Sequence, residues 1–212
     1  MENQHKSRQK NVLVTGSAHG IGYQLAYIFA RHSYNLVLID KDAEKLRTIA
    51  DDFINRLGIS VKILVKDLSI STSPEEIFNE LQTAGIKIDI LVNNAGIGTY
   101  GVFSETDLTQ ELKLLQINIV SLTHLTKLFL KDMISQGHGK ILNVASVAAF
   151  QPGPLMAVYF ASKAYVLSFS EAIANELEGT GVNVTTLCPG PTASKFQKSA
   201  AMEESKISHV NR

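Results

Sequence analysis

A tyrosine and a lysine in the C-terminal half of the chain are placed for proton transfer. Tyr159 and Lys163 lie four positions apart in a segment with helical spacing, so they share one face of a helix. A phenol has an ordinary pKa of about 10 and is a poor base near pH 7, but a nearby ammonium group favours the phenolate and lowers that pKa. The pair therefore predicts that Tyr159 gives a proton to a carbonyl oxygen during reduction, or removes one from an alcohol during oxidation.

Two further polar residues, Ser146 and Asn118, fit the same site. Ser146 follows an apolar run at 140–144, at the strand end where ligands bind in open α/β sheets, and its hydroxyl is suited to hold a substrate oxygen. Asn118 lies in an apolar helical stretch, where an amide needs partners. Each residue alone also has a structural interpretation, because Ser146 can cap the strand end and Asn118 can be a satisfied core amide.

A glycine-rich turn follows the first apolar run. Residues 15–22 read TGSAHGIG, in the pattern G-x-x-x-G-x-G. Such glycines allow a sharp exit from a strand and a close approach of the backbone to a ligand, and the helix that follows offers free N–H groups to a pyrophosphate. The turn alone is compatible with a tight connection. Its position between a strand and a helix favours a dinucleotide site with the contact residues Gly16, Ser17, His19, Gly20, Ile21 and Gly22.

An aspartate at the end of the second apolar run bears on the choice of cofactor. Asp40 lies about 20 residues beyond the turn, where a carboxylate accepts hydrogen bonds from ribose hydroxyls and repels a 2′-phosphate. His19 stands where an arginine or lysine could have met that phosphate. Both points favour NAD over NADP, whereas Lys41 could still reach a phosphate.

These residues require a framework of alternating strands and helices. Apolar runs at 11–15, 36–39, 61–65, 88–92, 140–144 and 182–187 predict strands, and the stretches 21–32, 42–57, 106–135 and 157–177 have helical spacing. The alternation predicts the α/β class, with a single Rossmann-like, doubly wound parallel sheet of about six strands flanked by helices on both faces. We expect residues 1–10 to form a flexible tail and residues 11–212 to form one domain.

Composition excludes several other classes. The 212 residues are 45% hydrophobic and 19% charged, with a formal net charge of zero, which is typical of a globular chain and argues against nucleic-acid binding by bulk charge. No apolar run approaches the roughly 20 residues of a membrane span, and the polar N-terminus is not a secretory signal. Cys188 stands alone, and the histidines lack metal-ligand spacing. These features predict a cytoplasmic protein with no membrane, nucleic-acid or metal partner.

The ordered set of motifs resembles the short-chain dehydrogenase/reductase family over about residues 11–192, most closely bacterial reductases of broad or unassigned substrate range. The specific part is the combination of Asn93-Asn94-Ala95-Gly96, an upstream Ser146 and Tyr159-x-x-x-Lys163. The resemblance implies a nicotinamide-dependent oxidoreductase acting on a secondary alcohol and a ketone or aldehyde. The glycine turn, Asp67-Leu68, Asn118 and the segment Pro189-Gly190-Pro191-Thr192 complete the match.

The resemblance also implies roles for individual residues. Lys163 would donate to the nicotinamide ribose, and Asn118 would hold a water that links Lys163 to solvent. The other implied cofactor contacts are Asp67 and Leu68 at the adenine, Asn94, Ala95 and Gly96 beneath the adenine ribose, and Pro189, Gly190 and Thr192 around the nicotinamide, with Pro189 and Thr192 at its carboxamide.

Members of the family usually continue beyond the point where this chain ends. We therefore expect the seventh strand to be missing, residues 193–206 to form part of the substrate cover, and an edge and an apolar helix face to be exposed. The apolar segment 147–158 favours a small hydrophobic carbonyl or alcohol as substrate. We expect a homodimer through the helices 106–135 and 157–177. Two alternatives stay open: a catalytically weak or inactive dinucleotide-binding protein, acting as a sensor or an assembly partner, and a chain that does not fold stably.

Overall fold

A parallel sheet forms the centre of the computed structural model, which describes residues 9–191. Its six strands run in the order β3-β2-β1-β4-β5-β6, all parallel to their neighbours, which confirms the predicted doubly wound α/β fold. The strand bounds are β1 Asn11–Thr15, β2 Asn35–Asp40, β3 Val61–Val65, β4 Ile90–Asn93, β5 Gly139–Val144 and β6 Val182–Leu187. The predictions for Thr192, for residues 193–212 and for most of the N-terminal tail lie outside the described residues.

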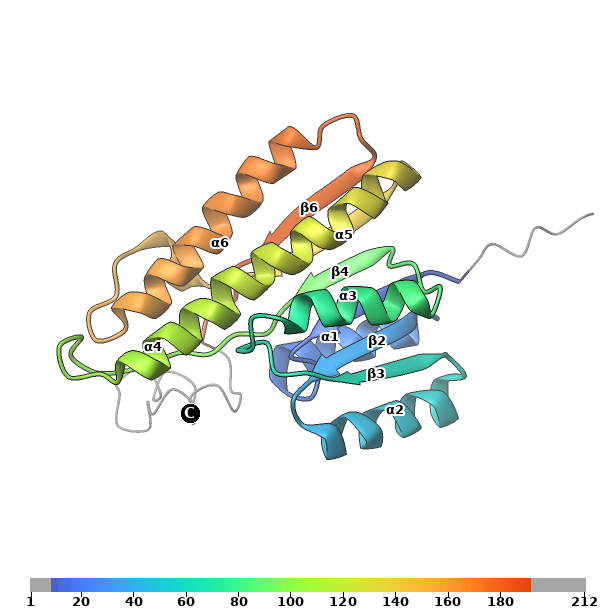
Figure 1. Cartoon of the computed structure of the whole chain (residues 1–212), viewed down its shortest axis with the longest axis horizontal. Helices are drawn as coiled ribbons and strands as arrows, with labels where there is room; N and C mark the ends of the chain where they lie inside the picture. Colours follow the sequence, from blue (N-terminus) through green and yellow to red (C-terminus); the bar gives the residue numbers. More distant parts are fainter. Residues whose placement is uncertain (1–8, 192–212) are drawn as a thin grey trace, which may run out of the picture.

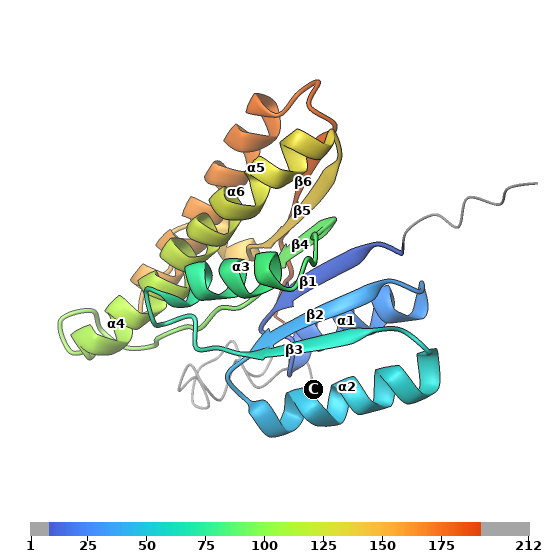
Figure 2. The ribbon, with the colours of Figure 1, turned by 45° about the vertical axis from the view of Figure 1, so that its right-hand side comes forward.

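Helices cover both faces of the sheet, as Figures 1 and 2 show. One core packs α1 and α2 against β1, β2 and β3, with Leu38 and Phe53 fully buried, and the other lies beneath α3 and α5. The helix bounds are α1 Gly20–Arg31, α2 Ala43–Leu57, α3 Ser73–Thr83, α4 Leu108–Leu115, α5 Leu122–Gln136 and α6 Ala157–Glu176, with a 3₁₀ turn η2 at Val147–Phe150. Local signals explain several ends, since the Asp42 side chain caps α2 and Gly137, at φ +70°, ends α5.

The helical stretch predicted at 106–135 is not one continuous α-helix. A π-helical segment, η1 at Gln116–Ser121, separates α4 from α5. A π-helical insertion turns the side chains in it away from the positions that a regular helix would give them, and such insertions occur frequently at functional sites. Asn118, one of the predicted site residues, lies inside η1 and is buried. The insertion therefore marks the part of the helix that faces the site.

Four polar side chains cross the buried side of the sheet beneath α5 and α6. The Asn93 amide donates to Thr126 Oγ1 at 3.0 Å and to Asn143 Oδ1 at 2.9 Å, and Asn143 Nδ2 donates to Ser170 Oγ at 2.9 Å. These residues link β4 to α5 and β5 to α6. Buried amides need partners, so this network requires all four elements to be in place.

The sheet ends at β6 among the described residues, and one face of this strand is exposed. Val182, Val184 and Thr186 form the less exposed face of β6, and among them Val182 is buried in the core. On the opposite face Asn183, Thr185 and Leu187 are exposed, so two of its three side chains are polar. An alternation of this kind is typical of a strand with one solvated face, which lowers the cost of leaving that face open.

Candidate active site

Four predicted catalytic residues come together where β4, β5 and α6 meet. The Lys163 ammonium lies 5.8 Å from the centre of the Tyr159 ring and donates to the backbone oxygen of Val144 at 2.9 Å. The hydroxyl of Ser146, just past β5, hydrogen-bonds to the Tyr159 hydroxyl. The four-residue spacing on α6 thus places Tyr159 and Lys163 on one buried face, as the sequence predicts.

The pKa of Tyr159 moves in the direction opposite to the one expected from its neighbour. Burial raises the pKa of the phenol, and the hydrogen bond from Ser146 only partly offsets this, so the net value lies above 10. The expected lowering by Lys163 is not found, because its ammonium is directed to Val144. Burial also lowers the pKa of Lys163 itself to about 8. Tyr159 is therefore a protonated acid at neutral pH in this state.

Asn118 ties the loop after β4 to α6. Its Oδ1 accepts from the Ile97 N–H at 3.0 Å, and its Nδ2 donates to the Ile97 carbonyl and to Ser162 Oγ, both at 3.0 Å. Ser162 in turn donates to the Tyr159 carbonyl at 2.7 Å. The side chain thus holds the backbone on both sides of the site, and the water relay implied by the resemblance stays a prediction.

The glycine turn is locked to the end of β4. Gly16 has φ +63°, and a Cβ atom there would lie 2.9 Å from the Ala95 Cα. The Asn94 amide donates to the carbonyls of Thr15 and Gly16 at 2.9 and 3.1 Å, and the Thr15 hydroxyl accepts from the Asn94 and Ala95 N–H groups. Asn94, which the resemblance assigns to the cofactor, thus shapes the turn, and Thr15 is a site residue that the predictions missed.

The start of α1 fits a pyrophosphate. His19 precedes the helix and makes no side-chain cap, so the N–H groups of the first turn at Gly20, Ile21 and Gly22 have no capping partner among the described residues. Gly22 allows close packing there, since a Cβ would lie 2.1 Å from the Gly16 oxygen. Ser17 is fully buried and donates to the Ile39 carbonyl at 3.3 Å, so its hydroxyl holds the turn. A helix N-terminus whose first N–H groups lack a capping partner is suited to bind phosphate.

Carboxylates surround the end of β2, where an adenine ribose would lie. Asp40 accepts from the N–H groups of Ala18 and Asp42, both at 3.1 Å, which connects the glycine turn to α2. Asp42 also pairs with His19 Nε2 at 3.1 Å. Lys41 is exposed. Two carboxylates at this place oppose a third negative group there.

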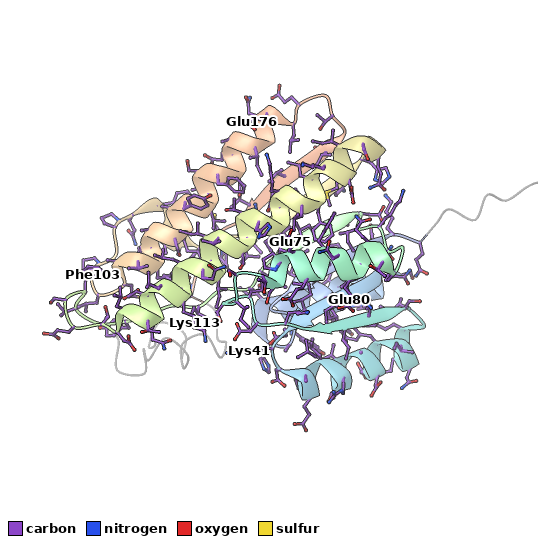
Figure 3. All side chains as sticks on the ribbon, in the orientation of Figure 1. Lys41, Glu75, Glu80, Phe103, Lys113 and Glu176 are labelled. Atoms are coloured by element: carbon purple, nitrogen blue, oxygen red, sulfur yellow. The ribbon has the colours of Figure 1, made fainter. Side chains whose placement is uncertain are left out.

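Asp67 and Leu68, which follow β3, occupy different environments. Leu68 is buried in the core with its carbonyl accepting from the Ser121 hydroxyl at 2.7 Å. Partial burial raises the pKa of Asp67, but hydrogen bonds from Ser69 and the charges of Lys113 and Lys41 outweigh it, so the net pKa lies below the usual value. Figure 3 shows the two lysines approaching this end of the site from α4 and from the β2–α2 turn.

The segment after β6 closes the other end of the site. The Pro189 carbonyl accepts from the Val147 N–H at 3.1 Å and from Ser146 Oγ at 3.5 Å, so Pro189 lies beside the predicted catalytic serine, and its assignment to the nicotinamide stays a prediction. Gly190 is exposed. The Cα of Gly96 faces the same place, since a Cβ there would lie 3.3 Å from Asn118 Oδ1 and 3.4 Å from Lys163 Nζ.

A separate cavity of about 520 Å³ lies between α1 and α2. It borders the glycine turn, and its lining does not include Tyr159 or Ser146. Its lining consists of Ala18, His19, Gly20, Tyr23, Lys45, Thr48, Ile49, Asp52 and Arg56. In the part of the chain that the structure covers, no group of three or more His, Cys, Asp or Glu side chains is arranged to hold a metal ion, and no helix has the length and apolarity to cross a membrane.

Comparisons with known proteins agree with this geometry. A family model described as "short chain dehydrogenase" matches residues 10–205. The mouse 17-beta-hydroxysteroid dehydrogenase type 3 is 38% identical over 180 residues, which cover 84% of this chain and 58% of that protein, so the chain spans less than two thirds of this relative. A short-chain dehydrogenase from Sphingobium yanoikuyae in complex with NADPH has a TM-score of 0.89 at 30% identity, covering 96% of this chain and 78% of the other. One from Burkholderia phymatum in complex with NAD has a TM-score of 0.84 at 27% identity, covering 94% and 72%.

Proposed function

The chain belongs to the short-chain dehydrogenase family, and on that premise we propose that it transfers hydride between a nicotinamide cofactor and a secondary alcohol or ketone. The observation that carries the proposal is the contact of the Tyr159 and Ser146 hydroxyls, one helical turn from the buried Lys163. When bound, the cofactor supplies the hydride chemistry. The chain supplies the site, the orientation of the substrate and the proton.

In the proposed reduction, the Ser146 and Tyr159 hydroxyls both donate to the substrate oxygen and hold it in place. Tyr159 then gives its proton to that oxygen as negative charge develops on it. Because burial keeps the phenol protonated near neutral pH, the site suits reduction in this pH range better than oxidation.

The surroundings of the site support a hydrophobic substrate. The loop between β4 and α4 is joined to the segment between Ser146 and Tyr159 by a hydrogen bond from the Gly101 N–H to the Leu155 carbonyl at 2.8 Å. Both loops expose large apolar side chains, among them Phe103 on the loop before α4 (Figure 3). The exposed set is Val102, Phe103, Val147, Phe150 and Leu155. Such a border favours a small hydrophobic ketone, aldehyde or alcohol over a sugar phosphate.

We further propose NAD as the preferred cofactor and a homodimer as the assembly. The carboxylates of Asp40 and Asp42 support NAD, while Lys41 and Lys113 leave binding of NADP open. The outer surfaces of α4 and η1 carry the exposed apolar side chains of Leu108, Leu112 and Val120, which suit a contact between two copies. A monomeric mass by light scattering at micromolar concentration would contradict the dimer. The cytoplasmic location stays a prediction.

Replacement of Tyr159 by phenylalanine tests the activity. We expect Tyr159→Phe to lower ketone reduction by about 100-fold or more while NADH binding, followed by fluorescence, stays unchanged. Tyr165→Phe is the matched control, since Tyr165 lies on the same helix but is exposed and bonds to Thr123. Equal turnover in the parent and Tyr159→Phe contradicts the mechanism. NADH binding by a parent that turns over no ketone supports the dinucleotide-binding alternative.

A further inference from the structure

Glu111 is a buried acid that the proposed mechanism does not use. It lies on the inner face of α4 and is only 6% exposed. Glutamate is almost never fully buried unless it is paired, because a carboxyl group taken out of water loses its hydration. The acid is one helical turn before Leu114, the other buried residue of α4. A buried carboxyl group such as that of Glu111 therefore requires a hydrogen-bond partner.

The partner of Glu111 is a hydroxyl in the loop between β4 and α4. Thr99 Oγ1 donates to Glu111 Oε2 at 2.9 Å. Residues 94–107 form no regular strand or helix, so tertiary contacts must fix the loop. Two further contacts flank Thr99: Ile97 bonds to Asn118, and the Gly101 N–H bonds to the Leu155 carbonyl. The loop is thus held at three alternate residues, and Glu111 provides the central attachment.

This loop forms one wall of the catalytic site. Its residues Ile97 and Tyr100 pack against a cluster that contains Tyr159, Leu114 and Met156. Tyr100 follows Thr99 directly, so the attachment to Glu111 limits how far the Tyr100 ring can move from Tyr159. The same loop also contacts η1, since the Asn118 side chain donates to the Ile97 carbonyl.

We propose that Glu111 is a positioning residue that, through Thr99, sets the shape of the substrate wall and so determines which ketones fit. The proposal rests on the proposed reductase function. Glu111 does not touch the reacting atoms. Its acceptor oxygen holds Thr99, Thr99 holds Tyr100 against the apolar cluster, and the cluster contains Tyr159. Loss of the attachment loosens the wall, which affects the binding of a bulky substrate more than the chemical step.

A double-mutant cycle tests this chain of contacts. We expect Glu111→Ala and Thr99→Val each to raise the KM for a bulky ketone by about five- to tenfold, the effect of losing one hydrogen bond, with little change in kcat or in the KM for acetone. The double variant should be no worse than either single variant, because both remove the same bond. Glu111→Gln and Thr99→Ser keep an acceptor and a donor and should restore the KM. Glu105→Ala, an exposed acid on the same loop, is the matched control.

Additive effects in the cycle overturn the proposal, and so does a Glu111→Gln variant as impaired as Glu111→Ala. Hydrogen exchange at the Gly101 amide gives a readout that needs no activity. Exchange should be faster in Thr99→Val and Glu111→Ala and unchanged in Glu111→Gln, and equal exchange in all variants overturns the proposal. If the parent reduces no ketone, the proposed function fails, while exchange still decides whether Glu111 holds the loop. If Glu111→Ala does not fold, Thr99→Val alone gives both readouts.

Discussion

Replacement of Lys163 by methionine should change how the stability of the protein depends on pH. Lys163 is 5% exposed, and burial lowers its pKa from an ordinary 10.5 to about 8. A tenfold change in an ionisation constant corresponds to about 1.4 kcal/mol, so keeping this ammonium charged in the folded protein costs about 3 kcal/mol. Between pH 8 and 10.5 the unfolded chain binds the proton and the folded chain does not. The free energy of unfolding of the parent therefore rises with pH in that window.

Methionine has a similar length and no charge, so Lys163→Met lacks this rise. The bond from Lys163 to the Val144 carbonyl is lost at every pH and shifts the two curves by a constant. We expect the stability of the parent relative to the variant to increase by about 2 kcal/mol between pH 7 and 10. Urea unfolding at several pH values measures it, because about 2 kcal/mol moves the midpoint by about 1 M for a chain of this size.

The control is Lys127→Met, at an exposed lysine of α5, which should leave the pH dependence of the parent unchanged. Parallel stability curves for the parent and Lys163→Met across the whole pH range would refute the reasoning, because they would mean that burial does not perturb the ammonium. Lys163→Met should also affect catalysis. The variant should also lose ketone reduction, so that a charge which destabilises the fold near neutral pH is retained for the reaction.

Two further outcomes follow from the site. Asp40→Ala should weaken NADH binding and improve NADPH binding relative to it, measured by fluorescence titration, because it removes a carboxylate near the ribose; a parent that already prefers NADPH would show this interpretation of Asp40 to be wrong. Since burial raises the pKa of Tyr159, alcohol oxidation should increase with pH between about 7 and 9 while ketone reduction changes little, and initial rates in both directions measure this. An oxidation rate that falls over this range would contradict the assigned pKa direction.

The framework could be predicted from the sequence because its signals are local. The strands β1, β3 and β6 have the bounds that their apolar runs indicate, and the Tyr159–Lys163 pair shares a helix face because spacing alone decides it. Parallel order and the position of the glycine turn follow from the alternation of elements. The family resemblance, which rests on separated motifs in the right order, is confirmed by the family match.

Contacts between distant segments could not be predicted in this way. The π-helical segment around Asn118 has no pattern that distinguishes it from the α-helix on either side, and its bonds to Ile97 exist only in the folded chain. The pKa of Tyr159 was expected to fall because proximity to Lys163 is visible in the sequence, whereas burial is not. The hydrogen bond from Thr99 to Glu111 could not be predicted either, because it joins a loop to a helix and forms only in the folded chain.

The amides of Asn93 and Asn143 have a consequence for how the two halves of the site meet. Each must find its partner across the β4–β5 boundary and under a helix, and a slip of one residue would turn both away from Thr126 and Ser170. A purely aliphatic boundary would tolerate several alignments at similar energy. The amides leave a single alignment, in which Asn93 at the end of β4 lies opposite Asn143, the residue before the last of β5. The strand register at the β4–β5 boundary therefore fixes the position of the glycine turn, which follows β1, relative to Ser146, which follows β5.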